Sequence, residues 1–231
     1  MAVMRAVAAV FDLDGTLIDT EPRSRALWSR LFDTHGVTYD DALIGSFAGR
    51  RGREVLAELL HLFPGRTVDE LFDQVMAFQA HPDWPALPAV EPVPGAVELV
   101  RRLHGDGVPL GLVTSGVRPY AEGLLLELGL TGLLDVVVTA DDVRNGKPHP
   151  EGYLAACSAL GVSPARSVAF EDAPAGVAAA KAAGMAVVGV ATTVPSELLS
   201  SADLVLPNLR DVRWPHVFGA ERGPEVGPAS G

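Results

Sequence analysis

The sequence is short of cysteine, of positive charge and of long hydrophobic runs. Cys157 is the single cysteine among 231 residues, which excludes an internal disulfide and a cluster of thiolate metal ligands. Lysine and arginine total 18 against 29 aspartates and glutamates, a formal net charge of −11. Because a nucleic-acid partner normally requires a basic face, this balance argues against one. Every apolar stretch is well below the ~18 to 20 residues of a membrane helix, which argues against a membrane span.

Hydrophobic residues, in contrast, are plentiful. They make up 48% of the chain, enough to form the core of one large domain or of a domain with an insertion. The apolar run near the N-terminus leads into Asp12 rather than into a small-residue cleavage site, which argues against a signal peptide. Together with the single cysteine, this favours a cytoplasmic protein.

That first apolar run ends at two carboxylates, Asp12 and Asp14, followed by Gly15 and Thr16. Side chains two residues apart along a strand point to the same face, so both carboxylates are expected to face one cavity. Two adjacent anions repel each other, and one takes up a proton unless a cation lies nearby. The pair therefore indicates a bound cation, a nucleophile beside a general acid, or both.

The periodicity of the chain then changes twice. Residues 21–80 show helical spacing, and Thr67 and Glu70 form a capping-box pattern before the last of these helices. From Gly95 onward, helical segments alternate with short apolar runs at 109–113, 136–138, 168–170, 187–190 and 204–206. This alternation predicts an α/β fold with a mostly parallel sheet covered on both faces, and a helical block inserted after the first strand.

These patterns predict four regions along the chain. The five prolines between 82 and 94 favour an extended connector, and the end of the chain from residue 216 has no apolar period. The expected regions are an α/β core over 1–19 and 93–215, a helical cap over 20–81, a connector over 82–94 and a disordered tail over 216–231.

Polar residues follow three of the expected strands, where ligands bind in open α/β sheets. Besides the first pair, they are Thr114-Ser115-Gly116 and Glu171-Asp172, and Lys147 lies between them in a proline-bounded loop. Carboxylates can hold a cation, a hydroxyl and backbone N–H groups can hold phosphate oxygens, and a lysine can neutralise charge. Each of these motifs alone could also be a turn, a helix cap or a solvated charge. Their occurrence together, in this order at the ends of three strands, indicates phosphoryl transfer.

The four motifs resemble those of the haloacid dehalogenase superfamily of aspartate-nucleophile phosphohydrolases, over roughly residues 6 to 207. The resemblance implies a Rossmann-like core with a helical cap inserted after the first motif. Segments 146–154 and 170–177 are similar to those of small sugar-phosphate and glycerol-phosphate phosphatases, and to the β-phosphoglucomutase branch. The mutases carry a histidine on the first cap segment, where this sequence has Ser24. That departure favours hydrolysis.

The resemblance also implies roles for individual residues. Asp12 is expected to be the nucleophile and Asp14 the general acid and base. Mg²⁺ is expected between Asp12, the backbone carbonyl of Asp14 and Asp172, with Glu171 one layer further out. The expected phosphate-binding residues are Thr114, Ser115, Gly116 and Lys147.

A dense positive patch of the cap consists of Arg50, Arg51 and Arg53. These arginines are either substrate contacts or a solvated loop at a helix start, and the sequence leaves both interpretations open. In either case, closure of the cap over the core is expected to exclude water and to select the substrate.

Three other activities share parts of this pattern. A phosphomutase uses the same core and retains the phosphoryl group. A signalling receiver domain has a similar set of side chains, but takes the phosphate on a mid-chain strand and lacks the helical insertion. A halide-releasing dehalogenase has no need of Asp14 or of the metal carboxylates. The sequence thus predicts a Mg²⁺-dependent phosphatase acting on a small sugar or polyol phosphate, with the particular metabolite and the oligomeric state left open.

Overall fold

The structure is a computed structural model that describes residues 4–47, 50–80, 87–215 and 217–218. Its strands are β1 (Met4–Arg5), β2 (Ala8–Phe11), β3 (Ile18–Asp19), β4 (Glu91–Pro92), β5 (Leu110–Val113), β6 (Val136–Val138), β7 (Ser167–Glu171), β8 (Ala186–Val190), β9 (Leu204–Leu206) and β10 (Val217–Phe218). Its α-helices are α1 (Glu21–His35), α2 (Asp41–Gly45), α3 (Gly52–Leu59), α4 (Val68–Ala80), α5 (Ala96–Gly105), α6 (Arg118–Glu127), α7 (Glu151–Ala159) and α8 (Pro174–Ala182). Short 3₁₀ helices are η1 (Leu60–Leu62), η2 (Ala140–Asp142), η3 (Pro164–Arg166) and η4 (Ser196–Leu199).

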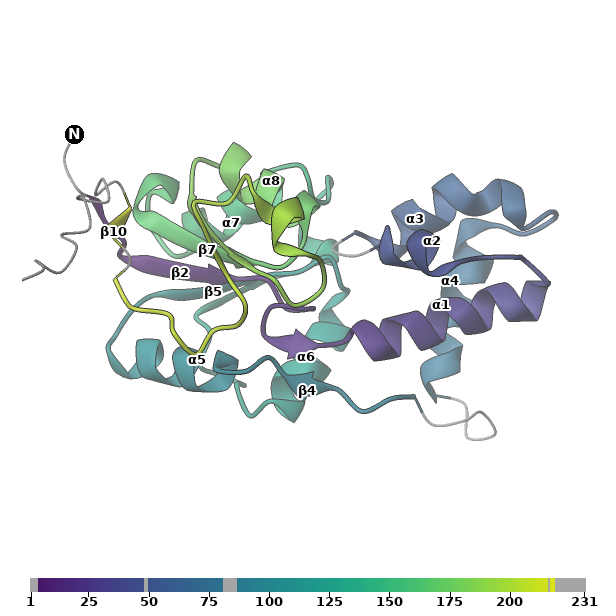
Figure 1. The fold of residues 1–231 in the computed structure, drawn as a ribbon, viewed down its shortest axis with the longest axis horizontal. Coiled ribbons are helices and arrows are strands. Elements are labelled where there is room, and N and C mark those ends of the chain that lie inside the picture. The colour runs from purple at the N-terminus through teal and green to yellow at the C-terminus, as the bar shows by residue number, and fades with distance from the viewer. Residues whose placement is uncertain (1–3, 48–49, 81–86, 216, 219–231) are drawn as a thin grey trace, which may run out of the picture.

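The core is a six-stranded sheet in the order β6-β5-β2-β7-β8-β9, in which all neighbours are parallel. Along β2 the buried side chains alternate between its two faces, as the two-residue period of a strand requires. Ala9 and Phe11 pack in the cluster that includes α5 and α6, whereas Val10 packs in the cluster that includes α7 and α8. Figure 1 shows these two helix pairs on opposite sides of the sheet. The predicted α/β fold, covered on both faces, is confirmed.

The register of the central strands brings their carboxyl ends to one edge. Phe11 of β2 lies opposite Leu112 of β5 and Phe170 of β7, and the rings of Phe11 and Phe170 stack with centroids 4.7 Å apart. Because the strands are parallel, the residues that follow them emerge together at this edge. Asp12, Thr114 and Glu171 are thus placed side by side by the sheet itself.

Helices α1 to α4 pack around their own hydrophobic cluster, which includes Leu31, Phe32, Leu56 and Leu71. They lie beyond the carboxyl ends of the strands, on the right in Figure 1. The two segments that join them to the core pair as the short antiparallel ladder β3-β4. The predicted division into core and cap at residues 19 and 20 stays a prediction, and residues 81–86 of the predicted connector lie outside the described residues.

Local details of the helical block differ in part from the sequence pattern. The capping box before α4 is present, since Glu70 N–H donates to Thr67 Oγ1 at 3.2 Å and Thr67 N–H donates to Glu70 Oε2 at 2.9 Å. The helical period around 55–63 divides into α3 and the 3₁₀ helix η1, and α2 is an additional short helix capped by Asp40.

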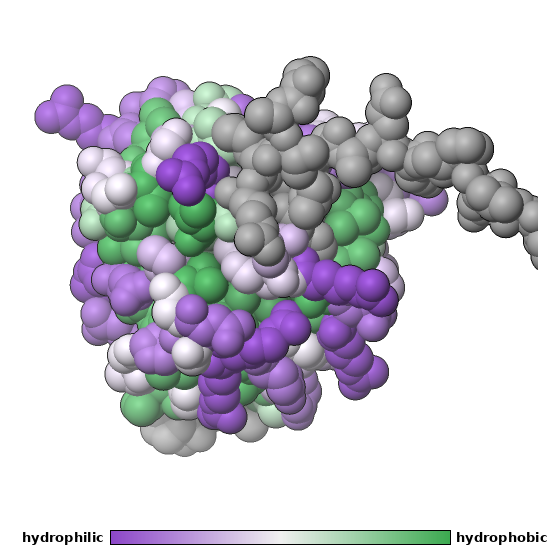
Figure 2. Space-filling model, turned by 90° about the vertical axis from the view of Figure 1, so that its left-hand side faces the viewer, coloured by the Kyte–Doolittle hydropathy of each residue, from purple (hydrophilic) through white to green (hydrophobic). Residues whose placement is uncertain are grey.

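The far end of the core holds the terminal strands. β1 and β10 pair antiparallel, so Val217–Phe218 form a strand inside the predicted tail, and residues 219–231 lie outside the described residues. On this end, which faces away from α1–α4, hydrophilic and hydrophobic residues are interspersed (Figure 2). None of the helices in the described part of the chain has the length and hydropathy that crossing a membrane requires.

Candidate active site

Asp12 and Lys147 form the centre of the site. Asp12 follows β2 directly and is 4% exposed, and Lys147 Nζ lies 2.5 Å from Asp12 Oδ1 and 2.6 Å from Glu171 Oε1. Burial alone would lower the pKa of Lys147, but the charges of Asp12 and Glu171 outweigh it and raise that pKa above its usual value. Lys147 therefore stays charged and holds the two carboxylates together.

Three carboxylates gather around this lysine. Asp12, Glu171 and Asp172 each offer an oxygen within 4.8 Å of the others. Burial and the charge of Asp12 raise the pKa of Glu171 to about 7, although the positive charge of Lys147 opposes them. Burial and the charges of Asp12 and Glu171 likewise raise the pKa of Asp172 well above its usual value. The cluster thus carries more negative charge than one lysine offsets.

This excess fits a divalent cation. Glu171 Oε2 is buried and has no hydrogen-bond partner among the described residues, so it is available as a ligand. Carboxylate oxygens are the donors that hard cations prefer. The sequence placed Glu171 one layer outside the ligands, whereas the structure brings its carboxylate into the same group as Asp12 and Asp172.

Two glycines of the motifs make room for these carboxylates. A Cβ at Gly15 would lie 2.1 Å from Asp172 Oδ2, and φ at Gly15 is +79°, in the region that favours glycine. A Cβ at Gly176, on α8, would lie 2.0 Å from the carboxyl carbon of Glu171. Both glycines are therefore required by close approach of a buried side chain.

The segment after β5 reaches the same cavity. Thr114 is buried, and its Oγ1 accepts a hydrogen bond from Gly116 N–H at 3.0 Å. The carbonyl of Gly116 accepts from Ala140 N–H at 2.9 Å, which ties this segment to the segment after β6. Ser115 and Gly116 line one cavity with Asp12 and Asp14, so two of the predicted phosphate-binding residues share a cavity with the acidic pair.

Asp14 is held by two hydroxyl groups. Thr20 Oγ1 donates to Asp14 Oδ1 at 2.8 Å, and Tyr120 OH donates to the same oxygen at 2.5 Å. Burial raises the pKa of Asp14, the charge of Asp12 adds to this effect, and the two hydrogen bonds oppose it. Asp14 thus favours its protonated form more than a free aspartate does.

The sequence interpretation missed two tyrosines. Tyr120 contacts Asp14, and the hydroxyl of Tyr153 donates to Glu171 Oε1. Tyr120 lies on α6, outside the motif segments, and Tyr153 lies on α7, inside the family-like segment 146–154 but without an assigned role. Their position within the first turns after the predicted site segments is the one signal that could have singled them out.

A cavity of about 360 Å³ lies between the acidic pair and the helical block. Its floor includes Asp12 and Asp14, and its wall on the helical block includes Trp28, Phe72 and Met76. The wall therefore combines apolar and aromatic surface with polar groups, as in many sites for small organic ligands.

The three predicted arginines line this cavity in different ways. Arg50 is paired with Glu58 and Arg53 with Asp69, in both cases within the helical block. Arg53 also lies over the ring of Phe72, 4.3 Å from its centroid.

Arg51, in contrast, reaches across to the core. Its guanidinium donates to the carbonyl oxygens of Ala140, Val143 and Arg144 at 3.2, 3.0 and 3.1 Å. A Cβ at Gly146 would lie 2.7 Å from its Nε, so this glycine admits the arginine. Arg51 thus connects the helical block to the loop that carries Lys147.

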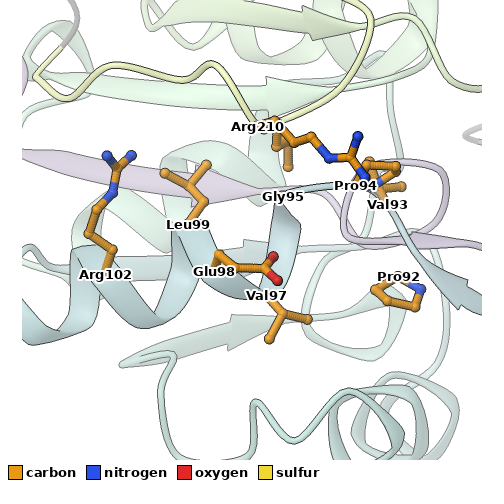
Figure 3. A pocket seen from close by; sticks show the side chains of 10 residues that line it. Pro92, Val93, Pro94, Gly95, Val97, Glu98, Leu99, Arg102 and Arg210 are labelled. Atoms are coloured by element: carbon orange, nitrogen blue, oxygen red, sulfur yellow. The ribbon is translucent and has the colours of Figure 1, made fainter.

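A larger cavity, of about 610 Å³, lies elsewhere on the core (Figure 3). Its lining includes Glu98 and Arg102 of α5 and Arg210 from the segment after β9, and Arg102 donates to the carbonyl of Val212 at 2.8 Å. It lies apart from the acidic cluster, so the chemistry of the lining, rather than the volume, identifies the candidate active site.

Comparison with known proteins decides the family. The family model described as haloacid dehalogenase-like hydrolase matches residues 7–184. The chain belongs to this family. The matched residues include all four motif segments around the haloacid dehalogenase-like site described above.

Two curated relatives and one solved structure illustrate the similarity. The chain is 53% identical to validoxylamine A 7′-phosphate phosphatase of Streptomyces hygroscopicus subsp. limoneus, over 90% of this chain and 97% of that protein. It is 34% identical to hexitol phosphatase A of Escherichia coli K12, over 90% and 94%. It resembles the crystal structure of β-phosphoglucomutase from Clostridium difficile with a TM-score of 0.74 and 25% identity, over 90% and 94%. The curated relatives support a phosphomonoester hydrolase over the phosphomutase alternative.

Proposed function

We propose that this haloacid dehalogenase-like protein is a Mg²⁺-dependent phosphomonoester hydrolase, with Asp12 as its nucleophile. The observation that carries the proposal is the position of Asp12. Its carboxylate contacts the ammonium of Lys147, is grouped with the carboxylates of Glu171 and Asp172, and lines the cavity of about 360 Å³. A nucleophile, a fixed cation and a site for a divalent ion are thus within reach of one phosphoryl group.

In the first step, a carboxylate oxygen of Asp12 attacks the phosphorus in line with the ester bond. The bond from phosphorus to the ester oxygen breaks, and Asp14 passes a proton to the departing alkoxide. The ammonium of Lys147, the hydroxyl of Thr114 and the N–H groups of Ser115 and Gly116 hold the equatorial oxygens, where negative charge collects. Asp12 then carries the phosphoryl group as an acyl phosphate.

In the second step, a water molecule attacks this phosphorus from the side that the alcohol has left. Asp14, now a carboxylate, takes the proton of that water, the bond from Asp12 to phosphorus breaks, and inorganic phosphate is released. The carboxylates of Asp12, Asp172 and Glu171 would hold Mg²⁺, which would supply positive charge that offsets the repulsion between the Asp12 carboxylate and the phosphate.

The substrate proposed is a small phosphorylated polyhydroxy compound, a sugar, polyol or cyclitol phosphate. The cavity volume suits a small metabolite, and Trp28 and Phe72 offer flat apolar surface for the carbon faces of a ring. Ser24 and the neighbouring arginines offer hydrogen-bonding groups for hydroxyls. The names of the two curated relatives, validoxylamine A 7′-phosphate phosphatase and hexitol phosphatase A, support a small phosphate ester as the substrate.

Ser24 also bears on the choice between hydrolase and mutase. It lies on α1 and lines the cavity, at the position where the resemblance places a histidine in mutases. A serine hydroxyl is a poor base at neutral pH, so a substrate hydroxyl has no strong base on this side to prepare it for accepting the phosphoryl group. Water then remains the acceptor.

A panel of sugar, polyol, cyclitol and nucleotide monophosphates, incubated with the protein and Mg²⁺, tests the proposal. We expect free phosphate from several polyol or cyclitol phosphates and much less from nucleotides. Isomerised sugar phosphate without phosphate release would favour the mutase instead. Release of phosphate at equal rates from every ester would contradict the proposed substrate class.

A further inference from the structure

Both hydroxyl hydrogen bonds to Asp14 fall on the same oxygen, Oδ1. We propose that Tyr120 is a positioning residue that fixes Asp14 by this oxygen, so that Oδ2 faces the ester oxygen and carries the proton passed to the leaving alkoxide. The inference rests on the proposed function, because it assigns the orientation of the acid in that reaction. It adds a residue outside the four motifs to the machinery of the site.

The two donors approach Asp14 from different parts of the molecule. Tyr120 lies on α6 of the core, whereas Thr20 lies directly before α1, where the chain enters the helical block. A carboxylate oxygen can accept about two hydrogen bonds in its plane, so Oδ1 is saturated by these hydroxyls. Neither of these two hydrogen bonds involves Oδ2. Oδ2 is therefore the oxygen left for proton transfer.

The position of Tyr120 is built into the fold. A Cβ at Gly116 would lie 2.7 Å from Cδ1 of the Tyr120 ring, so the glycine of the phosphate-binding segment admits the ring. The start of α6 is anchored as well, since Arg118 N–H donates to Asp141 Oδ2 at 2.9 Å and its guanidinium pairs with Asp142 at 2.7 Å. The same segment thus serves the phosphate and the acid.

The hydroxyl of Tyr120 acts as a donor in this contact. Burial and the adjacent charge of Asp14 raise the pKa of Tyr120 well above its usual value, so the hydroxyl keeps its proton. An oriented donor on one oxygen restricts rotation of the carboxyl group, and alignment within hydrogen-bond reach is what general acid catalysis requires.

The leaving group provides the test, because a poor leaving group requires the proton and a good one does not. Rapid-quench kinetics on Tyr120→Phe would compare hexitol 6-phosphate, whose alkoxide needs a proton, with 4-nitrophenyl phosphate, whose phenolate leaves without one. We expect release of the alcohol to slow about 10- to 100-fold, part of the 10²- to 10⁴-fold that general acid catalysis contributes. The first burst of nitrophenolate should stay within about twofold of the wild-type rate.

Controls separate orientation from a general loss of structure. Tyr39→Phe removes a hydroxyl from the ring that packs on Phe32 in the helical block and should change neither rate. Thr20→Val removes the second donor to Oδ1. Because the side chain of Thr20 makes no capping bond to α1, this variant should leave the helix intact. Thr20→Val therefore provides the same test if Tyr120→Phe does not fold. It should show the same dependence on the leaving group, and Thr20→Ser should restore the wild-type pattern.

Equal slowing of both esters, or no slowing of either, would overturn the role of Tyr120 while leaving the hydrolase itself intact. Absence of phosphate release from both esters by the wild-type protein would instead overturn the proposed function and this inference together.

Discussion

Charged side chains are buried at the floor of the cavity, whereas on its wall they pair with exposed carboxylates. Asp12 of the floor and its neighbours Lys147 and Glu171 are at most 7% exposed, and Lys147 binds both carboxylates. On the wall, Arg50 and Arg53 pair with Glu58 and Asp69, whose side chains are 62% and 79% exposed. Exposed pairs contribute about 0 to 1 kcal/mol, whereas burying several charges costs free energy that only a specific arrangement offsets. This difference fits the proposal that the chemistry takes place at the floor and that the wall recognises the substrate.

Asp12→Asn should have the largest effect. The amide is nearly isosteric but is a far weaker nucleophile, so we expect kcat to fall at least about 10⁴-fold, as for other catalytic nucleophiles. Circular dichroism should show an unchanged fold. Asp33→Asn, at an exposed position of α1, is the matched control and should keep wild-type activity. Substantial Mg²⁺-dependent turnover by Asp12→Asn would remove Asp12 from its role.

Lys147→Met should come next, with a loss in kcat of about 10²- to 10³-fold, the usual result of removing one charged or hydrogen-bonding group that stabilises the transferring phosphoryl oxygens. The change also leaves Asp12 and Glu171 without their shared cation. Lys181→Met is the control, because Lys181 pairs with Asp203 on a half-exposed surface of the core. A similar loss of activity in both variants would contradict the distinction between buried floor and exposed surface.

Mg²⁺ should stabilise the protein as well as activate it. The three clustered carboxylates, Asp12, Glu171 and Asp172, exceed the charge of Lys147, so binding of the ion relieves repulsion in the folded state. We expect a rise in Tm that depends on Mg²⁺ concentration, equivalent to about 2.7 kcal/mol of unfolding free energy at 100 times Kd. In Asp172→Asn the rise should be much smaller. A Tm independent of Mg²⁺ in the wild-type protein would count against the metal site.

Arg51→Met should have the smallest effect and should sharpen the boundary between wall and floor. Its guanidinium binds three carbonyls of the core loop near Lys147, so its loss should loosen the helical block over the cavity. We expect kcat/KM to fall about tenfold, the cost of one to two hydrogen bonds from a charged group. Arg25→Met, which breaks pairs with Glu21 and Asp41 inside the helical block, is the control. A larger loss in Arg25→Met would contradict this role of Arg51.

Local pattern predicted most of the fold and the residues of the floor. The apolar runs that form β6 and β8 are short and bounded by polar residues, so the positions of these two strands could be predicted within a residue or two. The strand order could not, because β2 pairs with β5 and β7, which lie far from it in the chain. The motif residues at the strand ends could be grouped because parallel strands share one carboxyl edge.

Contacts that depend on the placement of helices escaped prediction. The hydrogen bond of Tyr120 to Asp14 depends on how α6 packs beside the phosphate-binding segment. The bonds of Arg51 depend on the position of the helical block over the core. The place of Glu171 among the carboxylates depends on the space left by Gly176. None of these has a signature in residue spacing.

The most direct test of the account is to trap the covalent intermediate. The protein would be mixed with Mg²⁺ and a phosphorylated hexitol, quenched in acid within milliseconds, digested and analysed by mass spectrometry. The account predicts a phosphoryl group, removable by hydroxylamine, on the peptide that contains Asp12, and no label in Asp12→Asn. A phosphoryl group on another residue, or turnover with no labelled peptide at any time point, would contradict nucleophilic catalysis by Asp12.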